Sequence, residues 1–175
     1  MGYAGGTAAN PTYKQMGDHT ETLEIDFDSR LISFEDIVRL FWNSHNPARG
    51  TYKGRQYLSL FLYRDEEEKD VLLSVRASLS EQIEGNIGTE LQPFTSFTCA
   101  EQRHQKYYLK RYPKAWELLQ QYYGTEQALV DSTLVARLNS FVKGYGTLAS
   151  LKEEINTWEI HEKDELLRLV RELKW

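Results

Sequence analysis

The sequence predicts an α+β protein, built as a two-layer α/β sandwich that is followed by an all-helical extension. Two observations carry this prediction. Residues 21–91 read as strand, helix, strand, helix, strand, an order that is typical of two-layer sandwiches. From Lys114 onward the apolar residues recur only at helical spacing. We therefore expect a sandwich domain over residues 1–123 and a helical extension over residues 124–175.

The composition limits the class of function. Of the 175 residues, 41% are hydrophobic, which is enough for a core, and the net charge is -5 with no run of basic residues. Nucleic acid is therefore not an expected partner. No apolar stretch approaches the ~20 residues of a membrane span, so no membrane association is expected either. The single cysteine, Cys99, cannot form an internal disulfide, and it favours the cytoplasm or another reducing compartment.

The amino-terminal part predicts a loop and then a strand. The first twenty residues are rich in Gly, Thr and Asn, which are typical of irregular structure. Residues 21–27 alternate in polarity, so that Leu23, Ile25 and Phe27 face one side. This pattern predicts a half-buried strand, in which Glu21 shares the side of the apolar residues.

The other elements are bounded by polar caps, glycine and proline. The predicted elements are a helix over 34–45 that Ser33 begins, a strand over 57–63, a helix over 65–84 that Gly85 stops, a strand over 87–91, a helix over 100–112 that Pro113 stops, and tail helices around 134–142, 148–158 and 166–173.

Glu21 is the first candidate for chemistry. A carboxyl group that faces an apolar layer can act as an acid near neutral pH. The alternative is a glutamate at the end of a strand that remains in water, which is the usual place for this residue type.

Neither the cysteine nor the histidines define a site by themselves. Cys99 precedes a predicted helix, where a thiol can be reactive, but a buried and inert cysteine is the commoner case. The histidines His19, His45, His104 and His161 lack the converging spacing of metal ligands, so no metal site is predicted. His45 ends an apolar helix face and reads as a packed or capping residue.

Six short motifs resemble, in order, those of one known family. They are Gly2-Tyr3-Ala4-Gly5-Gly6-Thr7 with Asn10-Pro11-Thr12-Tyr13, His19-Thr20-Glu21, Phe41-Trp42-Asn43-Ser44-His45-Asn46-Pro47, Gln56-Tyr57 with Ser59, Thr89-Glu90-Leu91, and Ala100-Glu101 with His104-Gln105 and Tyr108-Leu109. Over residues 2–112 the sequence thus resembles the A-type peptide methionine sulfoxide reductases. The resemblance implies a ferredoxin-like form of the sandwich.

The resemblance also implies a chemistry. In that family a cysteine thiolate attacks the sulfur of methionine S-sulfoxide, in proteins or as the free amino acid. A glutamic acid protonates the sulfoxide oxygen while tyrosine hydroxyls hold it. Thioredoxin or another thiol then regenerates the cysteine, and no cofactor is bound. By motif matching, Glu21 would be the proton donor, and Tyr3 and Tyr57 would hydrogen-bond the sulfoxide.

The sequence departs from the family pattern at the nucleophile. The family's Gly-Cys-Phe-Trp-Gly motif lies before its Gly-Tyr-x-Gly-Gly motif, whereas this chain begins at Met1. The nucleophilic cysteine is therefore expected to be absent, and the sandwich to be incomplete at its amino terminus. The neighbours of Cys99 match another segment, Tyr52 stands where the family has an aspartate, and the family's carboxy-terminal resolving cysteines have no counterpart.

Three interpretations follow from these departures. The chain is a fragment, splice form or mis-set start of a longer reductase; or it is a cysteine-less pseudo-enzyme that binds something; or the helical extension makes it a helix-mediated binding protein on the same scaffold. The first is favoured, because a sandwich that lacks a central strand leaves backbone groups unpaired. The chain alone is then expected to be inactive, and marginally stable or self-associating.

Overall fold

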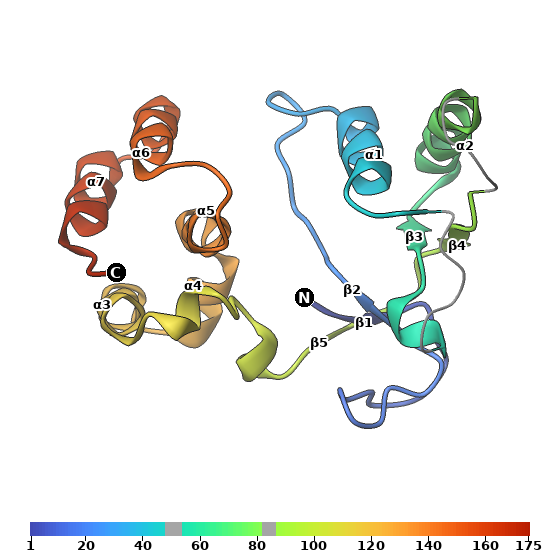
Figure 1. The fold of residues 1–175 in the computed structure, drawn as a ribbon, viewed down its shortest axis with the longest axis horizontal. Coiled ribbons are helices and arrows are strands. Elements are labelled where there is room, and N and C mark those ends of the chain that lie inside the picture. Colours follow the sequence, from blue (N-terminus) through green and yellow to red (C-terminus); the bar gives the residue numbers. More distant parts are fainter. Residues whose placement is uncertain (48–53, 82–86) are drawn as a thin grey trace. The chain divides into compact units, whose positions relative to one another are not determined.

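The computed structural model describes residues 1–47, 54–81 and 87–175. The chain divides into two compact units, an amino-terminal unit (Met1–Glu101) and a carboxy-terminal unit (Gln102–Trp175). The amino-terminal unit contains strands and helices, while the described elements of the carboxy-terminal unit are all helical (Figure 1). The predicted α+β class is confirmed.

The first sheet has three antiparallel strands, with β1 (Gly2–Ala4) between β2 (Thr20–Thr22) and β5 (Phe97–Cys99). Tyr3 lies opposite Glu21 on one side and opposite Thr98 on the other. The prediction of a loop over the first twenty residues is therefore wrong at β1. The close approach of β5 requires a glycine at position 2, because a Cβ there would lie 2.3 Å from the Thr98 carbonyl oxygen.

The predicted strand over residues 21–27 is also wrong beyond Thr22. The ladder with β1 ends at the pair Gly2–Thr22, so the following residues have no described strand beside them. Leu23 and Ile25 are 72% and 59% exposed rather than core-facing, and Phe27 is 40% exposed. The alternating polarity indicated an extended chain here, but it does not show whether a neighbouring strand is present to pair with that chain.

The second sheet pairs β3 (Leu60–Tyr63) with β4 (Glu90–Pro93) in parallel. Helices α1 (Phe34–Asn43) and α2 (Glu66–Ser80) belong to the same unit as this sheet (Figure 1). They share a hydrophobic cluster with it. The buried members of the cluster are Val38, Trp42, Leu72, Val75, Leu79 and Ile87. Both helices were predicted, and Ser33 caps the first as expected by accepting the Asp36 N–H.

Several predicted boundaries in this region move. The strand expected from residue 57 begins at Leu60, because Gly54–Tyr57 forms a short 3-10 helix, η1. The strand expected from residue 87 begins at Glu90. Gly85, the expected end of the second helix, lies outside the described residues.

A chain of hydrogen bonds joins α1 to the segments that enter β3 and β4. The Trp42 indole donates to Thr89 Oγ1 at 2.9 Å, and Thr89 Oγ1 lies 2.8 Å from Ser59 Oγ. Ser59 Oγ lies 2.7 Å from His45 Nε2, and His45 Nδ1 lies 2.8 Å from the Phe41 carbonyl oxygen. An indole can only donate and a carbonyl can only accept. A neutral His45 that donates from Nδ1 therefore satisfies every link, which confirms the packed and capping role expected for it.

The helix predicted over residues 100–112 is wrong. Residues Gln102–His104 and Leu109–Arg111 form two separate 3-10 helices, and Lys106 between them has a φ of +50°. That left-handed conformation interrupts an α-helix. Pro113 begins the next helix instead of stopping one, because a proline at the first helical position needs no N–H partner.

The carboxy-terminal unit is built from α3 (Pro113–Tyr123), α4 (Glu126–Asp131), α5 (Thr133–Val142), α6 (Leu148–Thr157) and α7 (Lys163–Glu172). These helices surround their own core, to which Leu119, Leu138 and Ile155 belong. The three predicted tail helices are confirmed. Of the helices in the described part, none is long and apolar enough to cross a membrane.

The hydrogen-bond chain at Thr89 predicts a stability effect. Thr89→Val keeps the shape of the side chain but leaves the buried Trp42 indole N–H and the Ser59 hydroxyl without this partner. We expect the variant to lose about 1–3 kcal/mol of unfolding free energy, the usual cost of an unsatisfied buried polar group. Urea unfolding followed through amide signals of the amino-terminal unit measures this. Thr95→Val, at an exposed position, is the control, and equal effects of the two changes would contradict the prediction.

Candidate functional site

The β1–β2 ladder places Tyr3 and Glu21 side by side. Because the two residues lie directly opposite each other, their side chains project from the same face of the sheet. Glu21 is half-buried, whereas Tyr3 is only 1% exposed. Two of the three residues that the resemblance selected are thus neighbours across one strand pair.

Gln56 connects Glu21 to the third selected residue, Tyr57. Its Nε2 donates to Glu21 Oε1 at 2.6 Å and to the Tyr57 hydroxyl oxygen at 3.1 Å. Both Gln56 and Tyr57 lie in η1, and Tyr57 is 47% exposed. The structure therefore brings Tyr3, Glu21 and Tyr57 together, the first pair through the ladder and the second through an amide bridge.

The two tyrosine hydroxyls are used differently. The Tyr3 hydroxyl donates to Glu101 Oε2 at 2.6 Å, so its single proton is directed at a carboxylate. The Tyr57 hydroxyl accepts from Gln56, so its own proton points in another direction. Glu101 Oε1 also accepts the Tyr13 N–H at 3.1 Å, which ties Tyr3 to the loop after β1.

Sequence reasoning missed Gln56 and Glu101 as members of the site. Both residues lie inside the motifs that resemble the family, Gln56 beside Tyr57 and Glu101 after Ala100, so the motifs could have indicated them as candidates. Nothing in the motifs indicated which side chains they contact, because Glu101 reaches Tyr3 across 98 residues of sequence.

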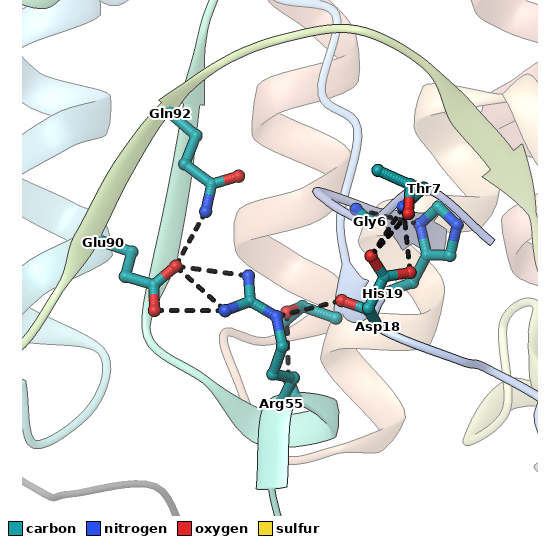
Figure 2. Close-up of polar contacts among 8 residues, drawn as sticks. Gly6, Thr7, Asp18, His19, Arg55, Glu90 and Gln92 are labelled. Carbon is teal, nitrogen blue, oxygen red and sulfur yellow. Dashed lines mark hydrogen bonds and ion pairs between the residues drawn. The ribbon is translucent and has the colours of Figure 1, made fainter.

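Asp18 and His19 close the loop between β1 and β2 (Figure 2). The Asp18 carboxylate accepts the Thr7 and Ala8 backbone N–H groups and the Thr7 hydroxyl at 2.9–3.0 Å. These bonds, the backbone ones foremost, hold the pKa of Asp18 well below its usual range. The buried His19 accepts the Gly6 N–H at Nδ1 and donates from Nε2 to the Ala8 carbonyl oxygen at 2.8 Å.

Cys99 lies in β5, and the expectation that it is buried or begins a helix is wrong, because it is exposed. Thr98 is the residue opposite Tyr3, so Cys99, the next along the strand, projects from the other face of the sheet. The thiol is therefore directed away from the face that carries Tyr3 and Glu21. Tyr52 lies outside the described residues.

Within residues 1–47, 54–81 and 87–175, no group of three or more His, Cys, Asp and Glu side chains is arranged to hold a metal ion. The hydrogen-bonded side chains of the site carry carboxyl, amide and phenol groups. These can donate protons to, and hydrogen-bond, a small polar oxygen such as that of a sulfoxide.

The amino-terminal unit is thus an α+β domain in which the Glu21 carboxyl group lies opposite Tyr3 on the sheet and is bridged by Gln56 to the Tyr57 hydroxyl of η1. The model of the family described as peptide methionine sulfoxide reductase matches residues 1–133. The chain belongs to this family, in its A type.

Individual relatives agree with this assignment. The chain is 40% identical over 161 residues to a peptide methionine sulfoxide reductase of Drosophila melanogaster. This alignment covers 90% of this chain and 63% of that protein. It is 36% identical over 146 residues to peptide methionine sulfoxide reductase A5 of Oryza sativa subsp. japonica, covering 81% and 57%. The chain thus spans less than two thirds of the length of these relatives.

A solved structure is also similar. Methionine sulfoxide reductase A of Corynebacterium diphtheriae superposes with a TM-score of 0.53 at 26% identity, over 65% of this chain and 62% of that one. This likeness supports the mixed α+β fold of the family.

The lowered pKa of Asp18 predicts a pH-dependent stability difference. Since the folded-state pKa lies below the unfolded value of about 3.9, the Asp18 carboxylate stabilises the fold above that pH, and the contribution is lost as pH falls toward the folded-state pKa. We expect Asp18→Asn to be less stable than the parent at pH 7, with a gap that narrows by pH 3. Urea unfolding at both pH values measures it, with Asp26→Asn at an exposed carboxyl group as the control. A gap of equal size at both pH values would be evidence against this role.

Proposed function

We propose that this chain supplies the sulfoxide-binding and proton-donating part of a peptide-methionine (S)-S-oxide reductase. Its substrate is methionine S-sulfoxide, in proteins or as the free amino acid. The observation that supports this most is the grouping of Glu21, Tyr3 and Tyr57, which come from three separate motifs and are completed by Gln56. The names of the relatives support the same reaction class.

In the proposed reaction a cysteine thiolate attacks the sulfoxide sulfur, and the S–O bond of the substrate breaks. The oxygen leaves with the cysteine as a sulfenic acid, one proton is taken up, and methionine is released. Two thiol groups of a reductant such as thioredoxin then return the sulfenic acid to the thiol, and the products are water and the disulfide of the reductant. No bound cofactor takes part, and such thiol chemistry suits the cytoplasm or another reducing compartment.

The proton is assigned to Glu21. Gln56 occupies Oε1, so Oε2 is the oxygen that carries the proton to the sulfoxide. Tyr57 hydrogen-bonds the sulfoxide oxygen through its hydroxyl group. Tyr3 hydrogen-bonds the same sulfoxide oxygen when its hydroxyl proton turns from Glu101 toward the substrate. Both tyrosines act by placing the oxygen and spreading its developing charge.

The domain plan proposed with this function is a ferredoxin-like sandwich over residues 1–123 and a helical extension over residues 124–175. The packing of α1 and α2 with β3 and β4 supports a sandwich of helices on strands. The helices of the extension share one buried core with Leu109, Ala115 and Leu119, so the compact helical unit begins before residue 124, at Gln102.

A cysteine-less binding protein is the second candidate, in which either the sulfoxide site or the helical extension does the binding. The placement of Cys99 favours it, because this one cysteine of the chain projects from the face opposite to Tyr3 and Glu21. In the reductase, a nucleophilic thiol from another part of the working protein reaches the site. In the binding protein, no thiol does.

The chain by itself should not reduce methionine sulfoxide. The thiolate is the reacting group, and Cys99 is on the wrong face of the sheet to reach a substrate held by Glu21. The assay combines the chain, dithiothreitol and N-acetylmethionine S-sulfoxide methylamide, with Cys99→Ser as the matched control. Turnover above the rate without protein, abolished in the control variant, would show that Cys99 is the nucleophile after all.

Glu21→Gln tests the proton donor in a form of the protein that includes a Gly-Cys-Phe-Trp-Gly segment. We expect the rate of the reductive step to fall about 10²–10⁴-fold, the usual contribution of a general acid. Substrate binding should change less, because an amide still hydrogen-bonds a sulfoxide oxygen. Single-turnover kinetics separate the two quantities, and Glu24→Gln, at an exposed neighbour, is the control. An unchanged rate would remove Glu21 from the mechanism.

A further inference from the structure

The 3-10 helix η1 carries Gln56 and Tyr57 but has no buried residue of its own. Hydrophobic packing therefore does not fix its position. Its described anchors are polar, beginning with the Arg55 carbonyl oxygen, which accepts the Thr20 hydroxyl at 2.9 Å. Thr20 is buried in β2 directly before Glu21, so this bond joins η1 to the strand that carries the proposed proton donor.

The Arg55 side chain supplies the remaining anchors (Figure 2). Its Nε donates to the Asp18 carbonyl oxygen at 2.9 Å, and its two terminal nitrogens contact the Glu90 carboxylate at 3.2 Å. Gln92 donates to the same carboxylate at 2.7 Å and so orients it. Arg55 thus connects η1 to the loop end before β2 and to β4.

These contacts are better suited to fixing a position than to adding stability. The Arg55 and Glu90 side chains are 36% and 41% exposed, and ion pairs at that exposure contribute little to folding. A guanidinium group, however, is planar and presents several donors in fixed directions. Because the Arg55 side chain contacts Asp18 and Glu90 at the same time, the backbone at the next residue, Gln56, can take few positions.

We propose that Arg55 is a positioning residue that sets Gln56 and Tyr57 at the right distance from Glu21. The 2.6 Å bond from Gln56 to Glu21 depends on where η1 lies, and Arg55 determines that place through Asp18 and Glu90. The inference rests on the proposed function where it concerns sulfoxide binding. The placement of Gln56 can be tested without any substrate.

The test compares the full chain with its Arg55→Met variant by NMR. The first readout is the pair of Gln56 side-chain amide proton signals, which report the bonds to Glu21 and Tyr57. We expect them to move toward the values of a solvated amide in Arg55→Met, and in the same direction in Glu90→Gln. The urea unfolding midpoint should stay at that of the parent. Arg39→Met, which removes a similarly exposed pair with Glu35, should leave the Gln56 signals unchanged.

The second readout is the dissociation constant of N-acetylmethionine S-sulfoxide methylamide, from a titration of the same samples. Arg55→Met should raise it roughly tenfold, the effect of losing one hydrogen bond at a charged group. If the parent chain does not bind the sulfoxide, the proposed function fails, while the Gln56 signals still decide the role of Arg55. Unmoved Gln56 signals in Arg55→Met would overturn the positioning role. Shifts throughout the amino-terminal unit together with a lowered unfolding midpoint would overturn it too, because they indicate a merely structural residue.

Discussion

The pairing of β1 with its two neighbours is the constraint on which the candidate site depends. The β2 side brings Glu21 opposite Tyr3, and the β5 side brings Thr98 opposite Tyr3, three residues before Glu101. Each ladder is only three residues long, so the strands alone fix the arrangement weakly. The side chains of Asp18 and His19 strengthen it, because they bond the backbone of Gly6, Thr7 and Ala8 at the point where the loop leaves β1.

Much of the family resemblance encodes scaffold rather than chemistry. Trp42, His45, Ser59 and Thr89 come from three separate motifs, yet they meet in one hydrogen-bond chain between α1 and the segments that enter β3 and β4. Every donor in that chain has an acceptor when His45 is neutral, so the chain holds the helix on the sheet. The motif residues therefore divide into a structural group around Trp42 and a group around Glu21 that carries the proposed chemistry, and the motif of Gln56, Tyr57 and Ser59 contributes to both.

The parts of the fold that sequence could predict are those specified by local signals. Helices α1 and α2 have caps at Ser33 and Asp65 and apolar residues at helical spacing, and both were found. The strands β1 and β5 could not be predicted, because three residues carry no period and their pairing joins segments nearly a hundred residues apart. The candidate site residues Glu21, Tyr3 and Tyr57 came from the resemblance, and their roles stay a prediction. Gln56 and Glu101 were missed, because their contacts exist only in the folded arrangement.

The hydrogen bonds of the Gln56 amide fit the proposed proton transfer, because they suit Glu21 both with and without its proton. An ionised carboxylate only accepts hydrogen bonds, so the amide nitrogen, and not its oxygen, must face Glu21 once the proton has left. When Glu21 still carries the proton on Oε2, Oε1 accepts the same N–H, so the 2.6 Å contact is compatible with both states. The second N–H of Gln56 remains on the Tyr57 oxygen throughout. The bridge therefore needs no rearrangement as the proton moves, and its bond to Glu21 strengthens as charge develops there.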